Sequence, residues 1–239
     1  MRQLRLIGIL WLTVLSALII IGLLFKTAPF SQLPSLVTIG FQESLLTIFV
    51  LILNDRWLHQ PVHYRSAQPW DQQLTSAGPT LVIAILISCY GLITATHFTT
   101  IVSALLMAGF ISFFEETFFR GIIFQSLRTS VGLVAAAIIS SLLFSLTHLI
   151  NLSHQSVNLT ILQLIFTFVL GLLLCGLAVR TQSLWWPIGI HAANDFFSLL
   201  QPPIKLPLIT STASFQVLEI IVVLILIWIL NQSHKTIAK

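Results

Sequence analysis

The sequence predicts an all-α membrane protein, a bundle of about eight transmembrane helices with both the N- and C-termini in the cytoplasm. Hydrophobic residues occupy 56% of the 239 positions and charged residues only 8%, whereas a soluble domain carries about 25% charged residues. The apolar residues are gathered in runs of about 20, the length that crosses the hydrocarbon core of a bilayer. The basic residues are distributed unevenly between these runs, as the positive-inside rule describes. We therefore expect a single polytopic membrane domain over residues 1–239.

Eight apolar runs have the length of a membrane span. The first, residues 6–25, follows a short basic N-terminus and is longer than the apolar region of a signal peptide, so we expect an uncleaved span. Residues 54–79 form the longest polar stretch, which we expect to be a cytoplasmic loop with Trp57 and Trp70 at the membrane interface. The remaining seven runs are 33–53, 80–97, 101–124, 131–150, 159–179, 184–200 and 215–230.

The 11 Lys and Arg residues support this topology. With eight spans and cytoplasmic ends, nine basic residues lie on the inner side and two on the outer side, which is a clear positive-inside bias. They do not cluster, so the net charge of +4 gives no indication of nucleic-acid binding. The inner residues are Arg2, Arg5, Arg56, Arg65, Arg120, Arg128, Arg180, Lys235 and Lys239, and the outer residues are Lys26 and Lys205.

The most informative segment is Glu115-Glu116-Thr117-Phe118-Phe119-Arg120, inside the run 101–124. A charged side chain at the bilayer centre costs roughly 2.5–3.5 kcal/mol on insertion scales, so three in six residues indicate pairing or function. Glu116 and Arg120 are four residues apart on one helix face, and we predict an ion pair between them. Glu115 is turned by about 100° from Glu116 and is free to face another partner.

Two further runs carry ionisable residues. His148 lies in 131–150, and His191 and Asp195 lie four residues apart in 184–200. Membrane proteins assemble interior sites from facing helices, so we expect Glu115 to meet these three residues in the bundle. Glu43, in 33–53, is predicted to have no catalytic role.

Three patterns, Glu115-Glu116-x-x-x-Arg120, Phe144-x-x-x-His148 and His191-x-x-x-Asp195, resemble the motifs of the CAAX protease and bacteriocin-processing family, also called the Abi family. Its members are intramembrane endopeptidases, and the order, spacing and placement of the motifs on the fourth, fifth and seventh spans agree. The resemblance covers roughly residues 107–199 and implies a catalytic helix core at 101–200.

The resemblance implies roles for the motif residues. Glu115 would be the general base that activates a water molecule, with His148 as its partner. His191 and residue 195 would stabilise the oxyanion. Residue 195 is aspartate here, where asparagine is frequent in eukaryotic-type members, and a carboxylate donates no hydrogen bond unless protonated. It could instead orient and charge His191. Glu116 is given two roles: it is a member of the catalytic set, and it forms a structural ion pair with Arg120.

Two mechanisms stay open at this point. Glu115, His148, His191 and Asp195 offer two imidazoles and two carboxylates, which is a plausible Zn²⁺ ligand set. A metal-free mechanism with a glutamate-activated water is the other, because peptide hydrolysis needs a base and a donor for the oxyanion. The sequence contains no His-Glu-x-x-His and no Gly-x-Ser-x-Gly, so neither a conventional zincin nor a serine hydrolase is expected.

We expect an intramembrane endopeptidase of the cell membrane that cleaves membrane-associated or hydrophobic peptides, in prokaryotic peptide processing or bacteriocin self-immunity. The alternatives are a CAAX-type prenyl protein C-terminal endopeptidase and a non-protease carrier that uses the same buried carboxylates and histidines. The expected partners are membrane lipid and a peptide or protein substrate, and no nucleic acid.

The predicted span limits place Glu115 and His148 at different depths in the membrane. Glu115 lies about 13 Å before the end of the run 101–124, whereas His148 lies about 25 Å after the start of the run 131–150. We therefore expect 131–150 to begin in the interface, with the site in the cytoplasmic half.

Overall fold

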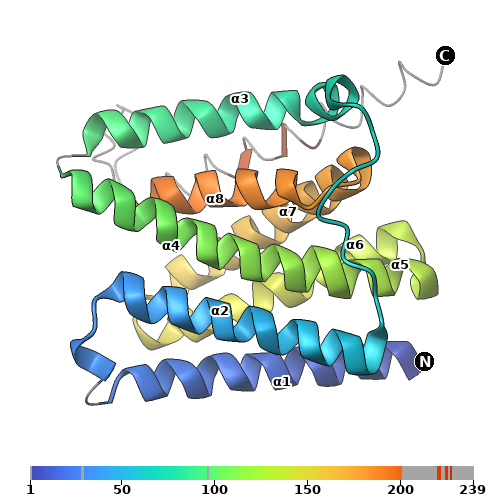
Figure 1. Cartoon of the computed structure of the whole chain (residues 1–239), viewed down its shortest axis with the longest axis horizontal. Helices are drawn as coiled ribbons and strands as arrows, with labels where there is room; N and C mark the ends of the chain where they lie inside the picture. Colours follow the sequence, from blue (N-terminus) through green and yellow to red (C-terminus); the bar gives the residue numbers. More distant parts are fainter. Residues whose placement is uncertain are drawn as a thin grey trace.

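The computed structural model describes residues 2–27, 30–95, 97–200, 220, 221, 224, 225 and 227, and it contains helices and no strand over these residues (Figure 1). This confirms the all-α fold class. The long helices are α1 (Arg2–Phe25), α2 (Ser35–Leu53), α3 (Trp70–Thr94), α4 (Phe98–Glu116), α6 (Leu133–Thr147), α7 (Val157–Thr181) and α8 (Trp185–Leu200). The short ones are η1 (Phe30–Gln32), η2 (Asn54–Leu58), η3 (Thr117–Phe124), α5 (Gln125–Val131) and η4 (His148–Ser153).

Six helices within the described residues are long and apolar enough to cross a membrane, so the chain is a multi-pass membrane protein. They coincide with the first six predicted spans. The seventh predicted span corresponds to α8, which has 16 residues, fewer than the roughly 20 that cross a bilayer without thinning it. The eighth, 215–230, falls outside the described residues except for five positions. The number of eight spans and the cytoplasmic placement of the termini therefore stay predictions.

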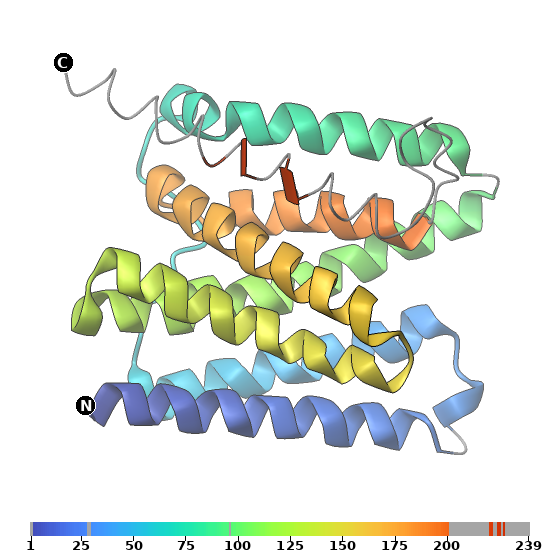
Figure 2. The same ribbon diagram turned by 180° about the vertical axis from the view of Figure 1, so that it is seen from behind.

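The helices are stacked side by side in the order α1, α2, α4, α8 and α3 from bottom to top of Figure 1, and α6 and α7 cross behind them, as Figure 2 shows. The central helix α4 packs against α2 on one side and α8 on the other. Large apolar side chains on the outer helices are exposed, for example Ile20, Leu86 and Ile93, as expected for surfaces that face lipid.

The interior is closed by phenylalanines that surround the Glu-Glu-x-x-x-Arg segment. The buried cluster includes Phe114, Phe118, Phe119, Phe124 and Phe144, together with apolar residues of α1 and α2. Arg120 lies inside this cluster with no exposed surface. It therefore carries no information about which side of the membrane its loop occupies, and eight inner against two outer basic residues remain for the positive-inside rule.

The structure differs from the predicted limits of the fourth and fifth spans. Helices α4, η3 and α5 form one helical run of 34 residues, Phe98–Val131, which continues through the polar residues after Phe124. The run ends at Gly132, whose φ of 83° is a left-handed conformation that glycine adopts without a steric penalty. Helix α6 starts at the next residue, Leu133.

This continuous run removes the disagreement in depth. Glu115 lies 17 residues before Gly132 and His148 lies 16 residues after it. At 1.5 Å per residue both are about 25 Å from the turn, so the two arms bring them to one level. An interfacial start of the fifth span is not needed to place them at the same depth.

Close packing of α6 on α7 depends on Gly171. A Cβ atom at this position would lie 2.8 Å from Ser141 Cβ and 3.1 Å from Arg120 Nη2, whereas a Cβ at Gly176 of the same helix would meet nothing within 4 Å. Gly171 thus allows α6 to approach α7 beside the buried arginine.

We predict that Gly171→Ala lowers the Tm of the protein in detergent by roughly 2–12 °C, because overpacking costs about 1–3 kcal/mol. Gly176→Ala on the same helix should leave the Tm unchanged or raise it slightly, since alanine favours helix by about 1 kcal/mol. Thermal unfolding followed by tryptophan fluorescence measures both. Equal Tm values for the two variants would contradict the packing role of Gly171.

Candidate active site

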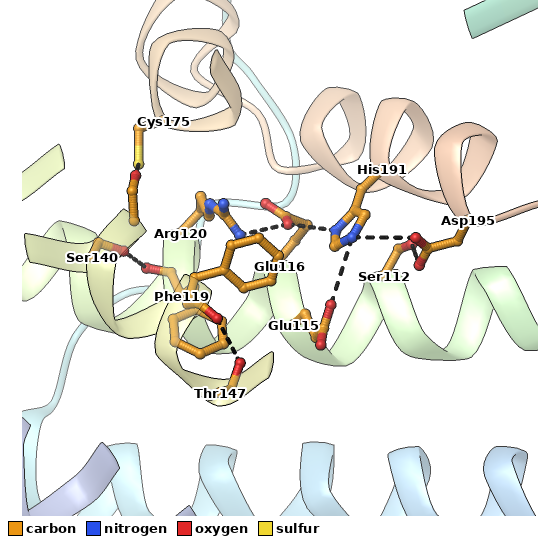
Figure 3. Close-up of polar contacts among 12 residues, drawn as sticks. Ser112, Glu115, Glu116, Phe119, Arg120, Ser140, Thr147, Cys175, His191 and Asp195 are labelled. Atoms are coloured by element: carbon orange, nitrogen blue, oxygen red, sulfur yellow. Dashed lines mark hydrogen bonds and ion pairs between the residues drawn. The ribbon is translucent and has the colours of Figure 1, made fainter. Parts of the chain in front are cut away.

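Three parts of the bundle supply the motif residues, and Figure 3 shows the first and third motifs facing each other across α4 and α8. The end of α4 supplies Glu115 and Glu116, and η3 supplies Arg120 one turn later. Helix α8 supplies His191 and Asp195, and α6 with η4 supplies Phe144 and His148. The segment η3 is π-helical, a conformation that often marks functional sites.

Glu116 is the centre of the buried polar contacts. Its Oε1 accepts a hydrogen bond from Arg120 Nη1 at 2.7 Å and a second from His191 Nδ1 at 2.8 Å. The side chains of Glu116 and Arg120 are 0% exposed and that of His191 is 4% exposed. One carboxylate oxygen thus joins an arginine of its own helical run to a histidine of α8.

The other nitrogen of the same imidazole faces two more carboxylates. His191 Nε2 lies 3.6 Å from Glu115 Oε2 and 3.6 Å from Asp195 Oδ1. Ser112, one turn before Glu115, donates to Asp195 Oδ2 at 3.4 Å. The helical rotation between Glu115 and Glu116 therefore lets the two adjacent carboxylates approach opposite nitrogens of one ring.

The hydrogen bonds define what each imidazole nitrogen can do. Glu116 Oε1 accepts hydrogen bonds from Arg120 and His191, and a carboxylate oxygen in such a pair is an acceptor only, so His191 Nδ1 carries a proton. Nε2 of a neutral His191 is then a bare acceptor, and it becomes a donor only in the doubly protonated ring. The carboxylates of Glu115 and Asp195 lie where they balance that extra positive charge.

Phe144 connects the histidines to the arginine. The Arg120 guanidinium carbon lies 4.3 Å from the centre of the Phe144 ring, a cation–π contact. The His148 and His191 rings both meet this phenyl ring edge-to-face, with centroid distances of 5.2 and 5.6 Å. Phe144, the first residue of the second motif, therefore packs against all three side chains: Arg120, His148 and His191.

His148 is anchored at the end of α6. Its Nδ1 donates to the Phe144 carbonyl oxygen at 3.1 Å. That bond places the proton of the neutral ring on Nδ1 and leaves Nε2 as an acceptor. The structure thus gives His148 an orientation suited to accept a proton or a hydrogen bond, and Phe144 separates it from Arg120.

Burial divides the carboxylates into two kinds. Glu116 has no exposed surface, whereas the side chains of Glu115 and Asp195 are 17% and 21% exposed. Glu115 and Thr147 also line a cavity of about 10 Å³ between α1, α4 and α6, close to the smallest space that holds one water molecule. Glu115 therefore has space beside it for a small molecule such as water, whereas Glu116 is enclosed on all sides.

Parts of the buried ion pair have no hydrogen-bond partner among the described residues. These are Glu116 Oε2 and the Nε and Nη2 atoms of Arg120. The Phe144 ring offsets part of this cost for the guanidinium. Such a pair is held by the surrounding packing, and removal of one partner leaves an uncompensated buried charge.

Three features of the site were not predicted from the sequence. The contact of Glu116 with His191 joins residues 75 positions apart, which no local spacing indicates. Ser112 could have been found, because it precedes Glu115 by three residues and shares its face. Glu43, for which no catalytic role was predicted, is buried in α2 on the side of the bundle where α2 packs against α4.

The four candidate metal ligands come from three helical segments: α4, η4 and α8. Glu115 and Asp195 each approach His191 Nε2, whereas His148 is held by its Nδ1 on the Phe144 carbonyl and has Nε2 as its remaining ring nitrogen. Among the described residues, no three His, Cys, Asp or Glu side chains are arranged to hold a metal ion. Zn²⁺ binding by these four residues therefore stays a prediction, and we assign no step to a metal.

Residues 97–197 match the family model described as type II CAAX prenyl endopeptidase Rce1-like. The match contains all three motifs, so the resemblance to the CAAX protease family is confirmed over these residues, and this is a family of proteases. No curated protein and no solved structure matches the chain.

We predict that Glu116→Gln destabilises the protein by about 3–5 kcal/mol, because it leaves Arg120 buried without its counter-charge. Glu115→Gln should cost much less, since Glu115 is partly exposed and forms no close ion pair. Thermal unfolding of both variants in detergent provides the comparison. If the two variants lose the same stability, Glu116 is not the acceptor that holds the core together.

Proposed function

We propose that this protein is an intramembrane endopeptidase that hydrolyses peptide bonds with a water molecule activated by Glu115. The observation that carries the proposal is the position of His191, held through Nδ1 by a dry carboxylate while Nε2 faces the partly exposed Glu115 and Asp195. Such an arrangement places a base and a potential oxyanion donor side by side at the boundary between the dry core and the accessible edge.

The reaction follows from these positions. Glu115 takes a proton from the water as the water oxygen attacks the carbonyl carbon of the peptide bond. His148 Nε2, free as an acceptor, orients the second hydrogen of the water. The carbonyl oxygen becomes an oxyanion beside the doubly protonated His191, whose Nε2–H donates to it. The proton held by Glu115 then passes to the leaving amine, and the C–N bond breaks.

Glu116 and Asp195 have different parts in this scheme. Glu116 fixes the direction of the His191 ring and keeps the proton on Nδ1. Asp195 supplies negative charge beside Nε2 and so favours the doubly protonated ring that the oxyanion requires. Because Asp195 sits on the Nε2 side and Glu116 on the Nδ1 side, we infer that Glu116 is the residue that orients His191.

The substrates we propose are membrane-associated or hydrophobic peptides, as in bacteriocin-type peptide processing or self-immunity. The family description favours a second class, the prenylated C-terminal segments of CAAX proteins. An assay with one farnesylated C-terminal peptide and one unmodified hydrophobic peptide separates the two classes. Cleavage of neither would favour the carrier alternative.

We predict that Glu115→Gln and His148→Ala each reduce the cleavage rate by about 10²–10⁴-fold, the usual contribution of general acid–base groups. His154→Ala should retain the wild-type rate, because His154 is an exposed histidine outside the site. The measurement is cleavage of labelled peptide by purified protein in detergent or liposomes. Full activity of both site variants would rule out the mechanism.

We further predict that cleavage survives dialysis against 1,10-phenanthroline and EDTA. The basis is the proposed mechanism, in which Glu115, His148, His191 and Asp195 activate the water and stabilise the oxyanion without a metal. Elemental analysis of the purified protein should give less than one Zn²⁺ per chain, without correlation with activity. Loss of activity on chelation, with recovery on addition of Zn²⁺, would instead support the metal mechanism with these four residues as ligands.

A further inference from the structure

A cationic cleft lies at one end of the bundle, apart from the active site. It has a volume of about 460 Å³ and is lined by the linker between η2 and α3, by α5 and by the turn between α7 and α8. Three of its lining residues are basic, His63, Arg65 and Arg128, and none of those identified is acidic. A cavity with this lining favours an anion.

The positive charges in the cleft are not neutralised within the described residues. Arg128 donates to Gln125 Oε1 at 3.0 Å, which is a neutral acceptor, and its guanidinium carbon lies 5.6 Å from the centre of the Phe124 ring. Arg65 forms no ion pair with a described residue. Both arginines are exposed and available to a ligand.

The cleft adjoins a larger apolar groove. This groove, of about 1060 Å³, lies between α3 and α8 and is lined by apolar residues that include Leu81, Ile85 and Ile190. Arg65 and Ser183 line both cavities. A ligand that occupies both therefore needs an anionic head and an apolar chain.

Tryptophans place this region at the membrane surface. Trp70, Trp185 and Trp186 all line the groove, and Trp70 is 70% exposed. Exposed tryptophan concentrates at the level of the lipid headgroups. The cleft thus lies at the depth where a phospholipid presents its phosphate.

The wall of the cleft is held in place by the bundle. The linker (teal in Figure 1) crosses the helices, and its His63 carbonyl accepts from the Leu184 amide at 3.0 Å. The Ser183 hydroxyl donates to the Tyr64 carbonyl at 2.7 Å, and the Tyr64 ring stacks on Phe113 at 5.6 Å. Arg65 follows directly, so its backbone is ordered before any ligand binds.

We propose that this region is a binding site for one anionic glycerophospholipid, with its phosphate between Arg65 and Arg128 and an acyl chain in the α3–α8 groove. Charge complementarity, headgroup depth and the junction of the two cavities at Arg65 together select this amphiphile over a neutral lipid. The site is separate from Glu115 and His191, and it does not depend on the proposed proteolytic activity.

The test is native mass spectrometry of the full chain in detergent, titrated with phosphatidylglycerol and, separately, with phosphatidylcholine. Wild-type protein should retain one phosphatidylglycerol with at least tenfold preference. The double variant Arg65→Gln/Arg128→Gln should bind it about 25-fold more weakly, at about fivefold per arginine near an anionic headgroup. The matched control Arg5→Gln/Arg56→Gln removes the same charge from exposed positions outside the cleft and should bind normally.

A second pair of variants tests the groove. Ser88→Trp fills it and should weaken binding of phosphatidylglycerol, whereas Leu92→Trp, an exposed position one turn further along α3, should not. Equal losses in both arginine double variants, or equal affinity for the two lipids, would overturn the proposal. Displacement of the lipid by millimolar inorganic phosphate, with no effect of Ser88→Trp, would reduce the site to a simple anion site and also overturn it.

Discussion

The shared acceptor Glu116 Oε1 is the contact on which the rest of the site depends. It binds Arg120 and His191 at 2.7 and 2.8 Å in a position without solvent, where each charged group has no alternative partner in water. Because Arg120 belongs to η3 and His191 to α8, this one oxygen ties the central helical run to the helix that packs beside it. The phenyl ring of Phe144 then closes over the arginine and receives both histidines on its edge. Any movement of α8 relative to α4 has to break a bond to a buried charge.

The two neighbouring glutamates illustrate how one sequence element serves two environments. Glu116 is enclosed by packing and acts only on protein groups, whereas Glu115 reaches the accessible edge and a space of the size of one water molecule. The division arises from helical rotation alone, since adjacent side chains point about 100° apart. His191 lies between them, so Glu116 orients its ring while its Nε2 faces Glu115. This explains how three charges in six residues are tolerated in a run of otherwise apolar sequence.

The sequence predicted those parts of the structure that follow from local spacing. The four-residue separation of Glu116 and Arg120 was enough to anticipate their contact, and apolar runs were enough to anticipate six membrane helices and their order. The contact of Glu116 with His191 could not be derived, because it depends on how α8 lies against α4. The limits of the fourth span were wrong because hydropathy falls after Phe124, where Gln125, Ser126 and Arg128 continue the helix without contributing apolar character. The role of Phe144 as a common surface for three side chains needed the tertiary structure.

The turn at Gly132 separates two helical segments of nearly equal length, one that carries Glu115 and one that leads to His148. This limits which insertions and deletions the sequence can accept. One residue inserted between Gly132 and Phe144 would turn the Phe144 and His148 rings together by about 100° and shift them by about 1.5 Å relative to Arg120 and His191. The same insertion between Glu116 and Gly132 would displace α6 relative to the carboxylates. Length changes in these segments are therefore incompatible with the site, although many substitutions that keep the helix are not. The number of residues between Glu115 and His148 is therefore constrained as much as their identity.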